Sequence, residues 1–242
     1  MLAVTARMKG MKNELLKEIE ELYITFSKYS FNPQIKGCSC CVSNPDKFTL
    51  NSKPLRELED DDINRFAYKT MTTWGTVDDF KYYLPRILEL TAQNKLTVHT
   101  FIILGKLDYS NWKNWDKSES DVIHKFLITW WTYDINNRIR SLDFELFIEL
   151  NKLLKNLPLL LEKWNVVVNE NGFVNYVNLI VYYFEDIIQV KDEFEEFSNE
   201  EINLLMNWID SNKKKLEVGY LQTENEDIKE SIKLAIDLLK NR

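Results

Sequence analysis

The chain has 242 residues, of which 45% are hydrophobic and 29% charged, and its net charge is −7. The hydrophobic fraction is large enough for a core, which excludes a disordered or fibrous chain. Only six glycines and five prolines are present, which argues against an all-β protein with many tight turns and favours long helices. The negative charge argues against nucleic acid as a partner, because phosphate binding requires a basic surface.

The cysteines and the apolar runs indicate the cellular location. All three cysteines fall within four residues, at positions 38, 40 and 41, whereas a disulfide framework would spread an even number along the chain. The N-terminal residues lack the apolar run of a secretory signal peptide. The longest uncharged apolar run, Gly172–Phe184, is shorter than the roughly 20 residues that span a bilayer. We therefore expect a cytoplasmic protein with reduced thiols and no membrane partner.

The first half of the chain alternates helical patterns with one irregular segment. Residues 1–10 are expected to form a disordered tail, and residues 32–62, which have no helical period, to form a long irregular loop containing the cysteines. Thr76 or Asp78 is expected to cap a helix that Pro85 kinks or shifts. Apolar spacing predicts helices over about residues 12–29, 62–73, 76–90 and 97–107.

The second half is more apolar and contains one ambiguous segment. Asn171-Gly172 is a hairpin signal, but the apolar run after it is too long for an ordinary strand, so a buried helix over about residues 173–189 is favoured. Another helix is predicted to start at Ser118 or Ser120. Four further helices are predicted over about residues 142–155, 158–164, 198–215 and 224–239. In total, the sequence predicts about nine helices that form one all-α domain over residues 11–242. Its architecture is either an irregular helical bundle or a HEAT-like stack of helical hairpins.

Three short sequence segments, called islands below, resemble those of a known protein family. They are Gly37-Cys38-Ser39-Cys40-Cys41, then Thr73-Trp74-Gly75 with Asp79-Phe80 and Leu84–Leu90, then Trp112-x-x-Trp115. This layout resembles a family of bacterial helical proteins with a GCxCC, TWG-x3-DF-x3-LPRILEL and WxxW pattern. The resemblance implies a mostly helical bacterial cytosolic protein and implies no activity.

The cysteine cluster is the first candidate site. Cys38, Cys40 and Cys41 could supply three thiolates to a soft metal such as zinc, with His99 or His124 as a fourth ligand. A structural zinc site would normally have a second ligand pair, which is absent here. The alternatives are a redox thiol activated by a nearby cation, and a purely structural loop anchor. The two histidines are otherwise expected to be interior side chains.

A second set of residues could form either a polar pocket or an ion-pair network. Asp79 and Arg86 are seven residues apart and therefore share a helix face, and Glu89 follows three residues later. Aromatic residues at helical spacing usually belong to a core, although two of the tryptophans lie in a polar connector. The full set is Trp74, Asp79, Arg86, Glu89, Trp112 and Trp115.

An acidic face is the third candidate. Ten carboxylates and one lysine lie between Glu170 and Asp210, a local charge of −9. Such a segment is either a solvated connector or a docking surface that steers a basic protein. The residues assigned to this face are Glu185, Asp186, Asp192, Glu193, Glu195, Glu196, Glu200 and Glu201.

Common catalytic and nucleotide-binding motifs are absent. The chain contains no GxGxxG, GxxxxGK[ST], HExxH or GxSxG sequence, and Lys213-Lys214-Lys215 is flanked by acids, which makes it a poor nucleic-acid patch. No catalytic residue is therefore assigned. We expect a non-enzymatic helical interaction module, such as an immunity-like inhibitor or an adaptor that docks a basic protein. A metal-binding protein or metal-dependent enzyme using the cysteine cluster is the alternative.

Overall fold

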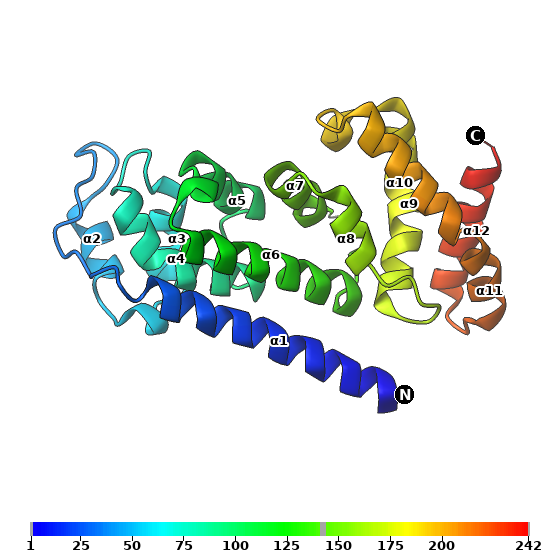
Figure 1. Ribbon diagram of the computed structural model, residues 1–242, viewed down its shortest axis with the longest axis horizontal. Helices are drawn as coiled ribbons and strands as arrows, with labels where there is room; N and C mark the ends of the chain where they lie inside the picture. The colour runs from blue at the N-terminus through cyan, green and yellow to red at the C-terminus, as the bar shows by residue number, and fades with distance from the viewer. Residues whose placement is uncertain (1, 141–143, 242) are drawn as a thin grey trace. The chain divides into compact units, whose positions relative to one another are not determined.

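The computed structural model describes residues 2–140 and 144–241, and side chains from Lys12 onward (Figure 1). Within these ranges the chain forms twelve α-helices, three short 3₁₀ helices and no strand. The all-α fold class is confirmed, and the expected number of about nine helices is too low. The finer choice of a HEAT-like stack remains a prediction.

The helices follow one another with short connections. In chain order they are α1 (Leu2–Phe26), α2 (Asn44–Leu50), η1 (Leu55–Glu57), α3 (Asp60–Lys69), α4 (Val77–Ala92), α5 (Thr100–Tyr109), η2 (Trp112–Asn114) and α6 (Lys117–Asn137). The remaining ones are α7 (Glu145–Leu154), α8 (Leu157–Lys163), α9 (Asn171–Gln189), η3 (Asp192–Phe194), α10 (Asn199–Asn212), α11 (Lys214–Gln222) and α12 (Glu226–Lys240).

Three of the predicted boundaries are wrong. Helix α1 begins at Leu2, whereas the predicted helix starts at about residue 12. The segment 32–62 contains α2, because the side chains of Ser43 and Asp46 cap its first turn reciprocally. The predicted helix 198–215 is broken at Lys213, where the backbone N–H bonds to the carbonyl of Asp210 and α11 starts anew.

Other local predictions are confirmed. Thr76 caps α4 and accepts from the backbone N–H of Asp79. Pro85 lies inside this helix and does not shift its start, so of the two expected effects only the kink remains a prediction. Asn171 and Gly172 open helix α9 and do not form a hairpin, because α9 buries a long apolar face that includes Phe173 and Ile180.

The chain divides into two compact units. The first is Lys12–Trp130, and the second is Met1–Met11 with Trp131–Arg242, so one boundary lies inside the continuous helix α6. The prediction of one domain over residues 11–242 remains a prediction. Across the described residues, no helix is both long and apolar enough to cross a membrane.

Each unit has its own aromatic core. In the first unit, the ring of Phe66 lies 5.4 Å from that of Trp74 and 4.7 Å from that of Tyr83. In the second, the ring of Trp164 lies 5.7 Å from that of Trp131 and 4.9 Å from that of Trp208. These cores hold the segments that carry the candidate sites.

Candidate metal centre

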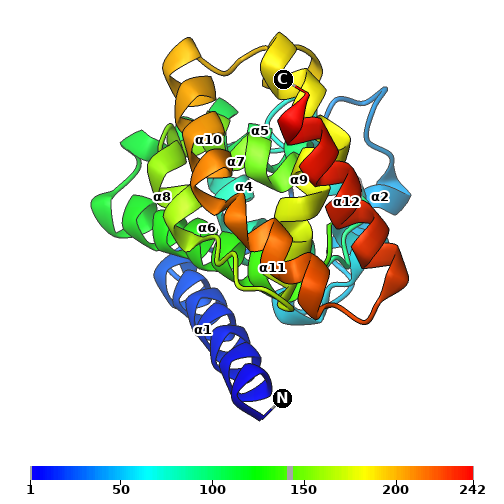
Figure 2. The ribbon, with the colours of Figure 1, turned by 90° about the vertical axis from the view of Figure 1, so that its right-hand side faces the viewer.

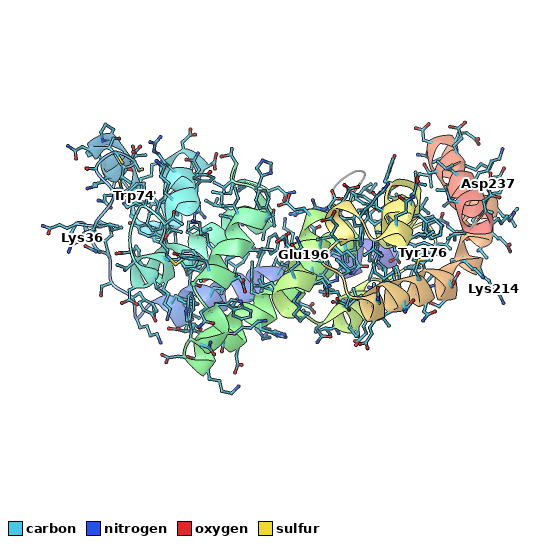
Figure 3. All side chains as sticks on the ribbon, turned by 90° about the horizontal axis from the view of Figure 1, so that it is seen from above. Lys36, Trp74, Tyr176, Glu196, Lys214 and Asp237 are labelled. Carbon is cyan, nitrogen blue, oxygen red and sulfur yellow. The ribbon has the colours of Figure 1, made fainter. Side chains whose placement is uncertain are left out.

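The cysteine turn, residues 38–41, is anchored to the connection between α3 and α4. The N–H of Cys38 donates to the carbonyl of Thr73 at 2.8 Å, and the N–H of Gly75 donates to the carbonyl of Lys36 at 2.8 Å. These bonds join the first two sequence islands, as the neighbouring Lys36 and Trp74 show in Figure 3. The buried Trp74 therefore acts as a rigid support for the turn.

Gly75 is needed for this anchor. Its φ of +79° lies in the left-handed region, and a Cβ there would approach Asp79, Ile35 and Phe66 to 3.2–3.3 Å. A larger residue at position 75 would disturb the connection that holds the cysteine turn.

The turn brings the three thiols together. The N–H groups of Cys41 and Val42 both donate to the carbonyl of Cys38, at 3.0 and 2.9 Å, which closes the turn. The Sγ atom of Cys40 lies 2.9 Å from that of Cys38 and 3.6 Å from that of Cys41, and all three lie within 4.8 Å of one another. Local backbone geometry alone therefore produces the convergence.

Two cations of helix α3 hold the far side of the turn. Lys69 Nζ donates to the carbonyl of Cys41, and a guanidinium nitrogen of Arg65 lies 3.5 Å from the same oxygen. Arg65 also pairs with Asp46 at 2.9 Å, in the first turn of α2. Because these cations contact a backbone carbonyl of the turn, they hold the turn in place and leave the thiols free to bind another group.

The thiols titrate differently although they are adjacent. Hydrogen bonds from the thiol and backbone of Cys40, followed by those from Cys41, lower the pKa of Cys38 to about 7. The contacts with Cys38 and then with Cys41 raise the pKa of Cys40 to about 11. Cys38 is thus half ionised near neutral pH, and thiolate is the form that binds metals.

The sulfur positions suit a soft metal ion. A tetrahedral zinc site with Zn–S bonds of about 2.3 Å separates its sulfurs by roughly 3.8 Å. The Sγ atom of Cys40 lies 2.9 Å from that of Cys38 and 3.6 Å from that of Cys41, so small side-chain rotations would reach this separation. Cys38 and Cys40 are exposed and Cys41 is half-buried, so an ion can enter from solvent.

No histidine or carboxylate among the described residues joins the three thiols as a fourth ligand. His99 lies at the start of α5, where its ring is 5.8 Å from that of Phe101. His124 lies on α6, and both histidines are exposed. The expectation of interior histidines is therefore wrong, because both side chains are exposed to solvent.

The structure distributes the second candidate set among several local contacts. Asp79 caps α4 and accepts from the side-chain amide of Asn32 at 2.9 Å. Arg86 donates to Glu89 at 2.7 Å and to the carbonyl of Leu58 at 2.6 Å, and Tyr23 donates to Glu89 at 2.6 Å. Arg86 and Glu89 thus form one ion pair that Tyr23 extends, whereas Asp79 belongs to a separate helix cap.

The tryptophans of that set lie in the core of the first unit. Trp74 and Trp112 are buried, and the indole N–H of half-buried Trp115 donates to the carbonyl of Ser110 at 3.0 Å. The Trp115 ring also receives the ammonium of Lys81 at 4.2 Å. In these contacts the tryptophans pack against neighbouring residues of the first unit.

Most of the acidic face is exposed. Phe194 and Phe197 are buried and hold the segment in place, while the carboxylates between and around them face solvent. Lys191 approaches Asp186 at 3.5 Å and Lys152 approaches Glu196 at 3.4 Å. Glu201 instead caps α10 and accepts from Asn151 at 2.8 Å. The exposed members are Glu185, Asp192, Glu193, Glu195, Glu196 and Glu200.

Sequence reasoning missed a buried charge cluster around Glu119. Glu119 has no exposed surface and accepts from Tyr29 at 2.6 Å and from Lys81 at 2.8 Å, while Lys28 lies at 2.7 Å. Burial raises the pKa of Glu119, but the hydrogen bonds from Lys28, Lys81 and Tyr29 outweigh it and hold this pKa below its usual range. The only sequence signal was the position of Glu119 soon after the two tryptophans.

No protein-family profile, curated protein or solved structure matches this chain. The candidate centre is therefore interpreted from its own geometry.

Proposed function

We propose that this protein binds a soft metal ion, with zinc as the first candidate, through Cys38, Cys40 and Cys41. The observation that carries the proposal is the convergence of three sulfur atoms within 4.8 Å on one turn. The lowered pKa of Cys38 supports it, because about half of this thiol is already ionised at pH 7 and metal binding needs the thiolate form.

The centre offers three protein ligands and one open position. A structural zinc site is normally closed by four protein ligands, whereas an open position admits water or another ligand. Thiolate ligands also suit Cu(I), which the same experiment distinguishes from zinc. The proposed activity is therefore metal binding or transfer, and no catalytic residue is assigned.

Metal analysis of native protein purified without chelator tests this proposal. We expect about one ion per chain and thiols that react with a disulfide reagent only after a chelator is added. Cys38→Ser, Cys40→Ser and Cys41→Ser should each lose the ion, whereas Ser39→Ala, on the same exposed turn, should retain it. Substoichiometric metal together with chelator-independent thiol reactivity would contradict the proposal.

We also propose that the acidic face docks a basic protein, as an inhibitor or adaptor would. Support comes from its exposed carboxylates, which the buried Phe194 and Phe197 hold on an ordered segment. A rigid acidic surface accelerates association with a basic partner.

Affinity capture from the native host tests this second proposal. Wild type should retain a specific basic protein that the double variant Glu193→Lys/Glu195→Lys loses. Glu230→Lys, an exposed reversal on α12, serves as the control. Capture that is identical for all three proteins, or no specific partner at all, would count against the acidic face.

A further inference from the structure

Helices α11 and α12 enclose a cleft that neither proposal above uses. They lie side by side as an antiparallel pair in Figures 1 and 2. The cleft measures about 540 Å³, within the range of roughly 300–1,000 Å³ typical of small-molecule sites. Its lining is Lys213, Lys214, Leu216, Glu217, Val218, Ile236, Leu239 and Lys240.

The apolar wall continues the core stripe of α12. Ile232, Ile236 and Leu239 follow one another at spacings of four and three residues and share one helix face. Ile232 is fully buried, whereas Ile236 and Leu239 are half-exposed in the cleft. Opposite them, Val218 of α11 is 44% exposed. The stripe thus extends beyond its packing partners and leaves apolar surface accessible.

The cleft has defined walls. Gly219 packs so closely on Phe173 that a Cβ at position 219 would lie 2.3 Å from the ring. On the other side, α12 packs on α9. Both helices are therefore held by α9, and the space between them belongs to the fold of the second unit.

All three lysines of the cleft lie at one end. Because α11 and α12 run antiparallel, the start of α11, with Lys213 and Lys214, faces the end of α12, with Lys240. Figure 3 shows Lys214 at this hairpin. Lys213 lies 3.8 Å from Asp210, and among the described residues neither Lys214 nor Lys240 has a carboxylate within ion-pair distance. Glu217 is the one acid of the lining, so three lysines minus one glutamate leave a charge of +2.

We propose that this cleft binds an amphiphilic anion, namely a free long-chain carboxylate. The apolar wall would receive the chain, and the lysine end would receive the carboxylate. A basic site in a chain of net charge −7 favours an anion specifically, because nonspecific attraction to the molecule would favour cations.

Calorimetric titration with dodecanoate below its micellar concentration tests the proposal. We expect one saturable site that binds dodecanoate at least tenfold more tightly than dodecyltrimethylammonium, which has the same chain and the opposite charge. Absence of saturable binding, or equal binding of the two compounds, would overturn it.

Variants localise the site. Lys214→Glu/Lys240→Glu should weaken dodecanoate binding at least tenfold, and Val218→Asp, which places a carboxylate on the apolar wall, should do the same. Lys233→Glu, exposed on α12 outside the lining, should leave the affinity within twofold. If circular dichroism shows that the double variant is unfolded, Lys214→Gln is used in its place. We expect that variant to bind dodecanoate at least threefold more weakly than wild type.

Vesicles distinguish a free carboxylate from a membrane surface. Binding to phosphatidylglycerol vesicles without binding to monomeric dodecanoate would overturn the proposal. The proposal would also be overturned if the cleft variants lost no more affinity for dodecanoate than Lys233→Glu does.

Discussion

The two compact units bury their polar side chains in different chemical forms. In Lys12–Trp130, five of the buried polar residues carry charge, namely Glu18, Asp79, Lys81, Lys106 and Glu119. Among the described residues of the second unit, five of the buried polar ones are asparagines and one, Asp134, is charged. The first unit therefore buries two carboxylates in ion pairs, Glu119 with Lys81 and Glu18 with Lys125, and such pairs titrate. The second unit buries one such carboxylate, Asp134, and otherwise uses asparagine amides, which do not titrate.

Asn175 illustrates the second unit. Its side-chain amide donates to the carbonyls of Ile135 and Arg138, both at 2.7 Å, and its oxygen accepts from the N–H of Arg140 at 2.5 Å. One uncharged side chain thereby satisfies three backbone groups where α6 ends.

The largest effect is expected from removing the central charge of the first unit. Glu119→Ala leaves Lys81 buried without its anion and should lower the free energy of unfolding by about 3–5 kcal/mol. Urea denaturation measures this. Asp121→Ala, on the same helix, removes an exposed pair with Lys117 and should cost less than about 1 kcal/mol. Equal losses in the two variants would refute the importance of burial.

The same cluster predicts a pH dependence. The folded-state pKa of Glu119 is below its ordinary value of 4.5, so the unfolded chain binds the proton more readily. The stabilisation is therefore complete above about pH 4.5 and decreases as pH falls through the lower folded-state pKa. Acid titration of wild type against Glu119→Gln should show this component only in wild type.

A smaller loss is expected in the second unit. Asn175→Ala leaves three backbone groups unsatisfied and should destabilise the protein by about 2–3 kcal/mol. Because the amide does not titrate, the loss should be the same at pH 4 and pH 7. Asn203→Ala, exposed on α10, is the control. A strongly pH-dependent loss would contradict the distinction between the units.

A still smaller effect concerns the cysteine turn. In metal-free protein at pH 7, Cys38 is half ionised, whereas an ordinary thiol with a pKa of about 8.5 is only a few per cent thiolate. Alkylation by iodoacetamide should therefore slow roughly tenfold in Cys38→Ser. Mass spectrometry of the modified residues measures the rate, and an unchanged rate would reject Cys38 as the most acidic thiol.

The smallest effect is expected at the surface of the first unit. Arg56 binds Glu20 through two nitrogens at 2.7 and 2.8 Å, with both side chains more than half exposed. Arg56→Ala should cost less than about 1 kcal/mol, and the difference should shrink further in high salt. Thermal unfolding at two salt concentrations measures this cost. A loss of stability as large as that of Glu119→Ala would contradict the expected difference between buried and exposed ion pairs.

Features that depend on nearby residues were predictable from the sequence. The cap at Thr76 needs only Asp79, and the cap at Ser198 needs only Glu201, three residues away in each case. The cysteine cluster is also local, so the amino-acid sequence alone identifies its residues. Its anchoring was not, because the Thr73 carbonyl and the Lys69 ammonium come from more than 25 residues further along.

Features that depend on distant packing were missed. The cluster around Glu119 joins Lys28 and Tyr29, which follow α1, to side chains of α4 and α6, and its members are up to 91 residues apart. The cleft between α11 and α12 depends on the packing of two separate helices, and its lining combines residues of both.

The helical class, most helix positions and the residues of the thiol cluster follow from the amino-acid sequence, because helical periodicity, caps and a C-x-C-C turn are short-range properties. Three other features emerge only from tertiary packing: which charges are buried together, the exposure of the histidines, and the cleft beside the lysine run. These outcomes depend on which surfaces pack and which lose water, and burial is a property of the folded chain as a whole.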